Sequence, residues 1–132
     1  MAKNVMAVIL GLFTAFLLNT VVLMINYHLF PLPQNLDQSD FEAMSEYMLS
    51  LPSIAHLIIL LAHIISATGA GFVVSRIASS YQLVLAGLLG GFLTIMGVIN
   101  LLQVPHPTWF NAIDPFVHLS FAYMGYRVGR KY

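Results

Sequence analysis

The chain lacks cysteine and carries few charged residues. The absence of cysteine excludes disulfide bonds, thiolate metal sites and thiol nucleophiles. Only 8% of the 132 residues are charged, whereas about 25% is usual in a soluble domain. Five basic residues and a net charge of zero argue against nucleic acid as a partner. There is too little charge to cover a water-facing surface, so we expect the lipid bilayer to surround most of the chain.

Apolar residues make up 59% of the chain and form four long segments, at about 5–26, 53–76, 82–103 and 107–127. A bilayer core of about 30 Å requires about 20 helical residues to cross it, and each segment has that length. We therefore predict one integral membrane domain over 1–132 with an all-α fold, a four-helix transmembrane bundle. The first segment is predicted to be a retained helix rather than a signal peptide, because its apolar core is longer than the usual core of about 7–15 residues.

Basic and acidic residues are separated along the chain without exception. The basic residues fall at the two ends or between the second and third segments. The acidic residues fall between the first and second segments or within the fourth. With four spans these sets lie on opposite sides of the membrane, and the positive-inside rule places both termini in the cytoplasm. The basic set is Lys3, Arg76, Arg127, Arg130 and Lys131, and the acidic set is Asp37, Asp40, Glu42, Glu46 and Asp114.

The connection between the first two segments is long enough to have structure of its own. Pro31 and Pro33 end the first helix. Ser39 and Glu42 have the spacing of a capping box, which predicts a short helix from about Asp40 to Leu49. Its apolar side chains recur at helical spacing, so the helix either lies on the outer bilayer surface or caps the mouth of the bundle. The apolar stripe consists of Phe41, Met44 and Met48, with Tyr47 beside them.

Small residues at helical spacing indicate where helices pack closely in the membrane. The third segment contains the pair Gly87 and Gly91, and the second contains Ala67, Gly71 and Ser75. We interpret these patterns as packing within the chain rather than as a dedicated dimer face. The same small residues are also compatible with a homo-oligomer.

Ionisable residues within the predicted spans are the strongest functional signal. Such residues are costly in a membrane, so each is a functional-site hypothesis by default. Asp114 and His118 lie one helical turn apart on the fourth segment and are expected to pair with each other. His63, near the middle of the second segment, lies at a similar depth. We predict that these three residues form an outward-facing polar pocket, flanked by Asn19 and His56.

The local structure at Asp114 has two interpretations. In the first, Asp114 lies within a helix and Pro115 leaves the carbonyl group of Asn111 without its helical donor. In the second, Asp114 is an N-cap and Pro115 is the first helical residue. Residues 108–113 would then form a separate interfacial turn.

The other polar residues of the spans have structural interpretations. Asparagines near the middle or outer end of a span can join helices through hydrogen bonds. Histidines beside the connections are expected in the wet interface, and aromatic residues there act as interfacial anchors. The asparagines are Asn19 and Asn100, the interfacial histidines are His28 and His106, and the anchors are Tyr27, Trp109 and Tyr126.

Several chemistries are compatible with the predicted pocket. The two imidazoles and the carboxylate of His63, Asp114 and His118 suit Zn, Fe or Mn, and a haem between the two histidines is chemically possible. A Ser–His–Asp arrangement would require Ser66 or Ser120 as the nucleophile. A proton relay or a small-ligand pocket needs only the groups already present. The sequence specifies no cofactor.

Three stretches carry a resemblance to a known family. They are Tyr27–Pro33 followed by Asp37, the Ala62-His63 pair with small residues after it, and Pro105–Phe110 with Asp114. In these stretches the chain resembles small bacterial four-span membrane proteins with no assigned function. The resemblance implies a four-helix fold in a bacterial inner membrane.

We favour a binding or translocation module over an enzyme. The first alternative is an accessory or scaffold subunit of a membrane complex, whose polar groups only hold helices together. The second alternative is a metal-dependent membrane enzyme.

Overall fold

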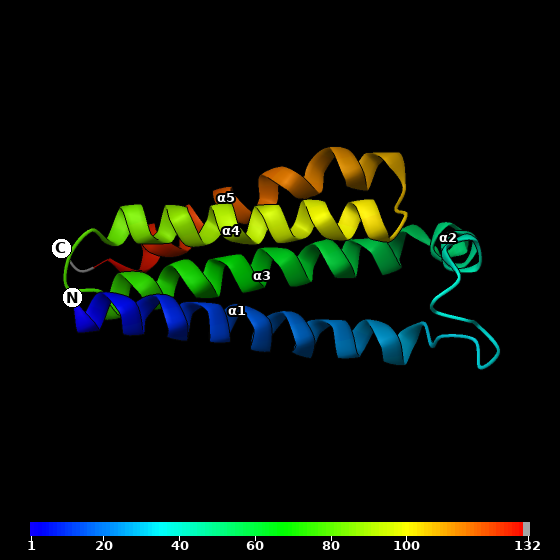
Figure 1. Cartoon of the computed structure of the whole chain (residues 1–132), viewed down its shortest axis with the longest axis horizontal. Helices are drawn as coiled ribbons and strands as arrows, with labels where there is room; N and C mark the ends of the chain where they lie inside the picture. The colour runs from blue at the N-terminus through cyan, green and yellow to red at the C-terminus, as the bar shows by residue number, and fades with distance from the viewer. Residues whose placement is uncertain (131–132) are drawn as a thin grey trace.

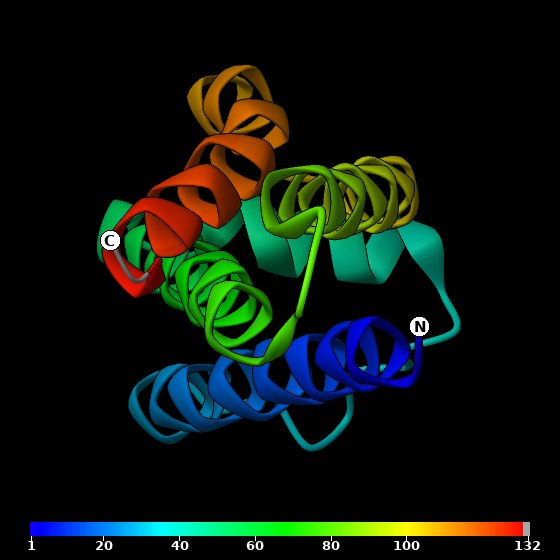
Figure 2. The same cartoon turned by 90° about the vertical axis from the view of Figure 1, so that its left-hand side faces the viewer.

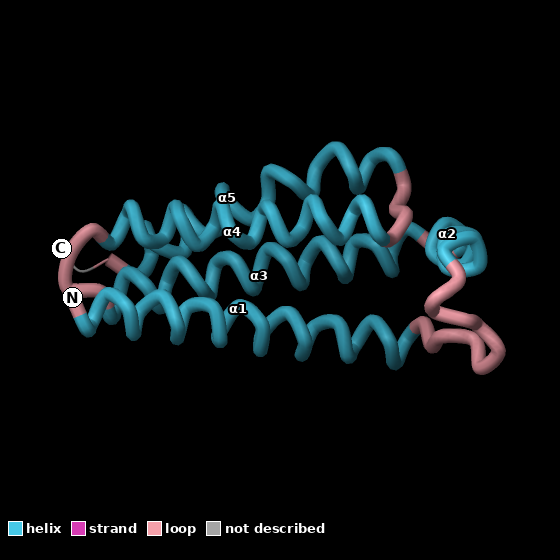
Figure 3. Tube along the Cα trace, in the orientation of Figure 1, coloured by secondary structure: helices cyan, strands magenta, loops and turns pink. Residues whose placement is uncertain are grey.

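The computed structural model describes residues 1–130, so Lys131 of the basic set lies outside the described residues. Within this range the chain forms helices joined by loops (Figure 3), and the prediction of an all-α fold is confirmed. The short helix expected between the first two apolar segments is present. The helices are α1 (Ala2–Leu29), α2 (Phe41–Ser50), α3 (Ser53–Ile77), α4 (Gln82–Gln103) and α5 (Thr108–Gly129).

Three of the long helices have the length and composition of membrane spans. Within residues 1–130, α1, α3 and α4 are long and apolar enough to cross a membrane. α5 has 22 residues, as many as α4, but it carries Asn111, Asp114 and His118 and is less apolar. The chain is therefore a helical protein with at least three candidate membrane spans.

The long helices run alongside one another, and α2 lies across one end of the bundle (Figure 1). The N-terminus and the C-terminal end of α5 lie together at the opposite end. Viewed along the bundle, α3 separates α1 from α5, and α4 lies beside α3 and α5 (Figure 2). We call these two ends the α2 end and the terminal end. The acidic residues of the first connection therefore lie far from Lys3, Arg76 and Arg127.

Proline and asparagine residues set the ends of the helices. Pro52 and Pro107 precede the first residues of α3 and α5, where their fixed φ and missing N–H group are tolerated. At the terminal end, the side-chain oxygen of Asn4 accepts hydrogen bonds from the backbone N–H and the hydroxyl group of Ser79, both at 3.1 Å. Its amide group donates to the hydroxyl of Ser80 at 3.1 Å. Asn4 thereby ties the start of α1 to the turn between α3 and α4.

The cap of α2 differs from the sequence prediction. Asp40, rather than Ser39, is the N-cap residue, and its carboxylate accepts from the N–H groups of Glu42 and Ala43 at 2.9 and 3.2 Å. Ser39 instead donates its hydroxyl to Asp37 at 2.6 Å. This bond and the Ser39 N–H group lower the pKa of Asp37. The predicted Ser39–Glu42 capping box was therefore wrong, because the Ser39 hydroxyl bonds to Asp37.

Replacing Asp40 by alanine is expected to destabilise α2 by about 0.5–2 kcal/mol, as is typical for loss of an N-cap side chain. Amide hydrogen exchange should therefore become faster across Phe41–Ser50. Ser39→Ala is the matched control, because it removes a hydrogen bond outside the helix. If Ser39→Ala accelerated exchange in α2 as much as Asp40→Ala, the assignment of the cap would be wrong.

α2 covers the α2 end of the bundle. Met48 is buried in a cluster with Ile59 of α3 and Phe110 of α5, and Met44 and Tyr47 pack against this cluster. The Tyr47 hydroxyl donates to the backbone oxygen of Phe30, the residue after α1, at 3.2 Å. Burial raises the pKa of Tyr47. Of the predicted apolar stripe, Phe41 alone points away from the bundle and is 60% exposed.

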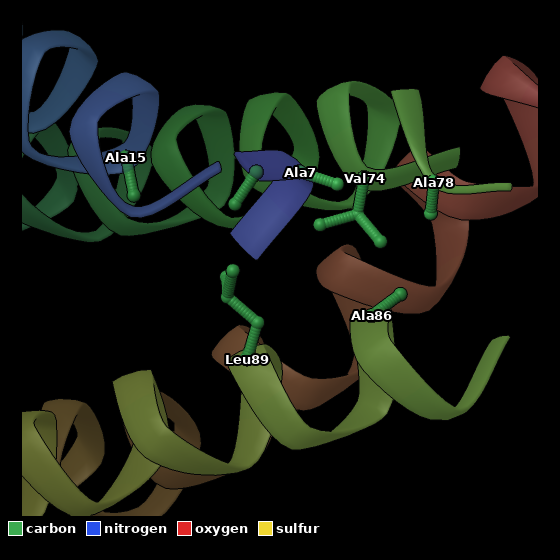
Figure 4. Packing of buried hydrophobic residues seen from close by; sticks show 7 residues of the cluster. Ala7, Ala15, Val74, Ala78, Ala86 and Leu89 are labelled. Atoms are coloured by element: carbon green, nitrogen blue, oxygen red, sulfur yellow. The ribbon is translucent and has the colours of Figure 1, made fainter. Parts of the chain in front are cut away.

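The terminal half of the bundle is filled by small apolar side chains. Leu89 of α4 and Val74 of α3 lie within contact distance of the position that a Cβ atom would take at Gly11 of α1. Figure 4 shows Ala15 of α1, Val74 of α3 and Leu89 of α4 pointing toward the space between these three helices. The space between α1 and α4 is therefore closed in this half. The buried members of this inner cluster are Ala7, Ala15, Ala70, Val74, Ala78, Ala86 and Leu89.

Glycine permits the closest helix contact, which is between α3 and α5. A Cβ atom at Gly71 would overlap the backbone oxygen of Ala122, and one at Gly125 would overlap the backbone oxygen of Thr68. The second segment therefore packs within the chain, as its small residues predicted. The interpretation was wrong for Gly87 and Gly91, since a Cβ atom at either would meet nothing within 4 Å in the described chain.

Candidate functional site

The structure brings His63, Asp114 and His118 together between α3 and α5, with α4 alongside. Their potential ligand atoms all lie within 4.8 Å of one another. Nδ1 of His63 lies 2.5 Å from Oδ1 of Asp114, and the rings of His63 and His118 have centroids 4.8 Å apart. The three residues that sequence reasoning grouped by depth are thus neighbours in space.

The pairing within this trio differs from the expectation. Asp114 and His118 were expected to pair along α5, but the Asp114 carboxylate is bonded to His63 across the interface with α3. The glycines at the α3–α5 contact bring the two backbones close enough for this bond. Asp114 therefore bonds to His63 on the adjacent helix rather than to His118, one turn away on its own helix.

Asp114 lies within a continuous helix. α5 runs from Thr108 to Gly129 with Pro115 inside it, and its N-cap is Pro107. The interpretation of Asp114 as an N-cap was therefore wrong. Pro115 has no N–H group to donate to the carbonyl of Asn111.

Two atoms of the trio are buried without a hydrogen-bond partner among the described residues. They are Oδ2 of Asp114 and Nδ1 of His118. Asp114 is fully buried, and His118 is 5% exposed. Leaving a buried polar atom unpaired costs about 1–3 kcal/mol, and more when the group is charged. A ligand that bonded to both atoms would remove this cost.

Gly97 of α4 packs against the His118 ring and lies beside both atoms. A Cβ atom at this position would lie 2.8 Å from Cε1 of His118, 3.3 Å from its Nδ1 and 3.5 Å from Oδ2 of Asp114. Any larger residue at 97 would therefore displace the His118 ring. Sequence reasoning missed Gly97 as a site residue. The available signal was a glycine on the third segment at the depth predicted for His118.

A cavity of about 350 Å³ connects the trio to the α2 end. His63 and Ser66 of α3 and His118 of α5 lie at its inner end, and Met44 and Met48 of α2 line its outer end. Its side walls come from α1 and α4, which are apart in this half of the bundle. The wall residues are Ala15, Phe16, Asn19, Leu23, Asn26 and Tyr27 of α1, and Phe92, Leu93, Met96, Gly97 and Asn100 of α4.

Two asparagines of α1 add polar atoms to this cavity. Asn19 and Asn26 both line it, and the side-chain oxygen of each is buried without a partner in the described part of the chain. Asn19 was expected to flank the pocket or to join helices, and only the first position is observed. The cavity therefore has polar groups along one wall and at its inner end, with apolar side chains between them.

His56 does not join the trio or line the cavity. It is fully buried, with its ring 6.0–6.4 Å from the rings of His106, Trp109 and Phe110. These rings surround His56 in the first turn of α3. His56 therefore does not reach the pocket that it was expected to flank.

His106 was expected in the wet interface but is only 6% exposed. Its ring stacks on Phe110, with centroids 4.7 Å apart, and its Nδ1 lies 2.6 Å from the backbone oxygen of Val104. Burial lowers the pKa of His106. His28, by contrast, is exposed at the end of α1.

The geometry argues against two of the chemistries that the sequence left open. The hydroxyl of Ser66 donates to the backbone oxygen of His63 at 3.0 Å rather than to an imidazole, and Ser120 is exposed on α5. A Ser–His–Asp arrangement is therefore not formed. The rings of His63 and His118 are too close, at 4.8 Å between centroids, to hold a haem between them.

Comparisons of the chain with protein-family models, with curated proteins and with solved structures give no match.

Proposed function

We propose that this chain is a four-span membrane protein in which α5 is the fourth span. The polar residues that lower the hydropathy of α5, Asp114 and His118, are buried against α3 and α4. The side chains that α5 leaves exposed are mostly large and apolar, and side chains of this kind suit a lipid-facing surface. The large apolar ones are Ile113, Phe116, Leu119, Tyr123, Met124 and Val128. The remaining exposed residues of α5 are Thr108, Asn111, Ala112, Ser120 and Arg127.

The orientation that we propose follows from the charged residues at the two ends of the bundle. Lys3, Arg76 and Arg127 lie at the terminal end, which by the positive-inside rule faces the cytoplasm. The α2 end carries four acidic residues and faces the outside. Together with the resemblance to small bacterial four-span proteins, this charge distribution supports our proposal of a bacterial inner-membrane protein, with both termini cytoplasmic and α2 periplasmic.

The function that we propose is the binding of a small polar solute that reaches the trio from the outside through the cavity. The observation that carries the proposal is that His63 and His118 line the inner end of the cavity, while Nδ1 of His118 and Oδ2 of the adjoining Asp114 have no partner among the described residues. Polar groups that serve only to join helices would be bonded to each other. Binding is favoured over translocation because the small apolar side chains of the inner cluster close the terminal half of the bundle.

Single-cysteine labelling tests this proposal, since the chain has no cysteine of its own. In intact cells, a charged, membrane-impermeant methanethiosulfonate added outside is expected to label Asn19→Cys. Leu17→Cys is the matched control, because Leu17 is 52% exposed on the lipid-facing side of α1 and its thiol would lie in hydrocarbon. Ala7→Cys, in the inner cluster, should also stay unlabelled. Equal labelling of Asn19→Cys and Leu17→Cys would overturn the proposed access.

A further inference from the structure

The donor atoms of the trio form a set that divalent transition metals prefer. Two imidazoles and one carboxylate from His63, Asp114 and His118 converge within 4.8 Å. Metal–nitrogen and metal–oxygen bonds of about 2.0–2.2 Å hold ligand atoms at most about 4.4 Å apart. Side-chain movements of about an ångström would therefore bring the three groups to bonding distance.

The burial of the unpaired atoms points to a cation. Oδ2 of Asp114 and Nδ1 of His118 both lack a hydrogen-bond partner among residues 1–130. Both can bind a metal ion, the first as an ionised carboxylate and the second as a neutral imidazole with its proton on Nε2. His118 is more than nine-tenths buried, and Asp114 is completely buried. One cation between them would bond to both atoms at once, and the buried carboxylate, already bonded to His63 through Oδ1, would gain a partner for Oδ2 as well.

Glycine at residue 97 lets the α4 backbone approach the two unpaired atoms closely. The position of a Cβ atom at Gly97 lies 3.3–3.5 Å from the two unpaired atoms. A side chain at residue 97 would therefore push on the His118 ring and lie beside both donors. His63 and His118 also line the cavity, so an ion here would face it.

We infer that His63, Asp114 and His118 bind one divalent first-row transition-metal ion of the zinc type. The inference rests on the proposed function and names the class of solute for the same cavity. Three protein ligands leave at least one coordination position open toward the cavity, as in sites where the metal also binds water or a further ligand. The bond between His63 and Asp114 would rearrange so that both side chains turn toward the ion.

Titration of the purified full-length protein in detergent with Co²⁺ tests the inference, because Co²⁺ substitutes for Zn²⁺ and absorbs visible light. We expect one equivalent of Co²⁺ with the strong visible bands of a four- or five-coordinate ion, and displacement of Co²⁺ by Zn²⁺. The unaltered protein is used, so this measurement does not depend on the folding of any variant. Spectra that stay those of hydrated Co²⁺ would overturn the inference.

Gly97→Ala tests the position of the ion without removing a ligand. The added methyl group pushes on the His118 ring, and misorienting a ligand typically weakens metal affinity about 10–100-fold. Gly91→Ala is the matched control on the same helix, because its added methyl group meets nothing within 4 Å. Equal Co²⁺ affinity in Gly97→Ala and Gly91→Ala would place the ion elsewhere and overturn the inference.

His118→Cys provides a spectroscopic signature for one ligand. Since the chain contains no other cysteine, a thiolate-to-Co²⁺ charge-transfer band in this variant would identify residue 118 as a ligand. His28→Cys, at an exposed position on α1, should lack the band. A band in both variants, or in neither, would contradict the assignment.

Failure of this inference is distinguishable from failure of the proposed function. If Asn19→Cys is labelled from outside but no Co²⁺ or Zn²⁺ binds, the cavity is accessible and the metal assignment alone is wrong. If Asn19→Cys is not labelled, the outward access fails regardless of the metal titration.

Discussion

Replacing His63 by leucine is expected to lower the free energy of unfolding by about 3–5 kcal/mol, the usual cost of removing one partner of a buried ion pair. Asp114 is fully buried, and its Oδ1 is bonded to His63 at 2.5 Å. Its Oδ2 has no partner in the described chain, so no second bond compensates for the loss. Unfolding by a denaturing detergent can be followed through the fluorescence of Trp109, the single tryptophan.

A double variant shows whether the lost pair is the cause. Replacing a whole buried pair with apolar residues is often neutral, so His63→Leu combined with Asp114→Val should recover most of the lost stability. His28→Leu is the control for a histidine without buried contacts and should leave unfolding unchanged. A double variant no more stable than His63→Leu alone would show that an unpaired Asp114 is not the source of the loss.

Replacing Gly71 by alanine is expected to cost about 1–3 kcal/mol or more, in the range of overpacked contacts. The added Cβ atom would overlap the backbone oxygen of Ala122. Backbone cannot rotate away as a side chain can, so α3 and α5 must separate. Because the bond between His63 and Asp114 crosses the same interface, we expect this bond to lengthen. We also expect the extent of labelling of Asn19→Cys by the external methanethiosulfonate to change.

Gly91→Ala is the control for this change as well. It places the same methyl group on a helix where nothing lies within 4 Å, and alanine is the better helix former by about 1 kcal/mol. The melting temperature in detergent should stay constant or rise for Gly91→Ala and fall for Gly71→Ala. Equal melting temperatures would mean that α3 and α5 do not pack as closely as described.

Most helix positions follow from local signals in the sequence. Apolar length marked the four long segments, and Pro31, Pro52 and Pro107 lie where helices end or begin. The cap of α2 was assigned to the wrong residue, since Ser39 and Asp40 are adjacent and both side chains can cap a helix. Which of them does so depends on Asp37, which binds the Ser39 hydroxyl.

The members of the trio were predictable, but their pairing was not. Counting residues from the helix ends placed His63, Asp114 and His118 at similar depths. Depth does not give the rotation of a helix about its axis, and the close contact at Gly71 and Gly125 sets that rotation for α3 and α5. The carboxylate therefore meets His63 rather than its helical neighbour.

The position of His56 also could not be predicted from depth and helix face. It lies seven residues before His63 and so shares a face of α3 with it. Depth and face predicted a place beside the pocket, but Phe110 and His106 pack there. The packing of the connection between α4 and α5 determines where His56 lies, and the periodic pattern of apolar residues carries no information about that packing.

Nitrogen NMR of the histidine side chains tests the central claim most directly. In Asp114→Asn, which keeps the size of the side chain and removes its charge, we predict a large change in the Nδ1 resonance of His63. A smaller change is predicted for His118, whose ring lies beside that of His63, and none for His28. Unchanged resonances of both His63 and His118 would mean that these side chains do not meet Asp114, and the site described here would not exist.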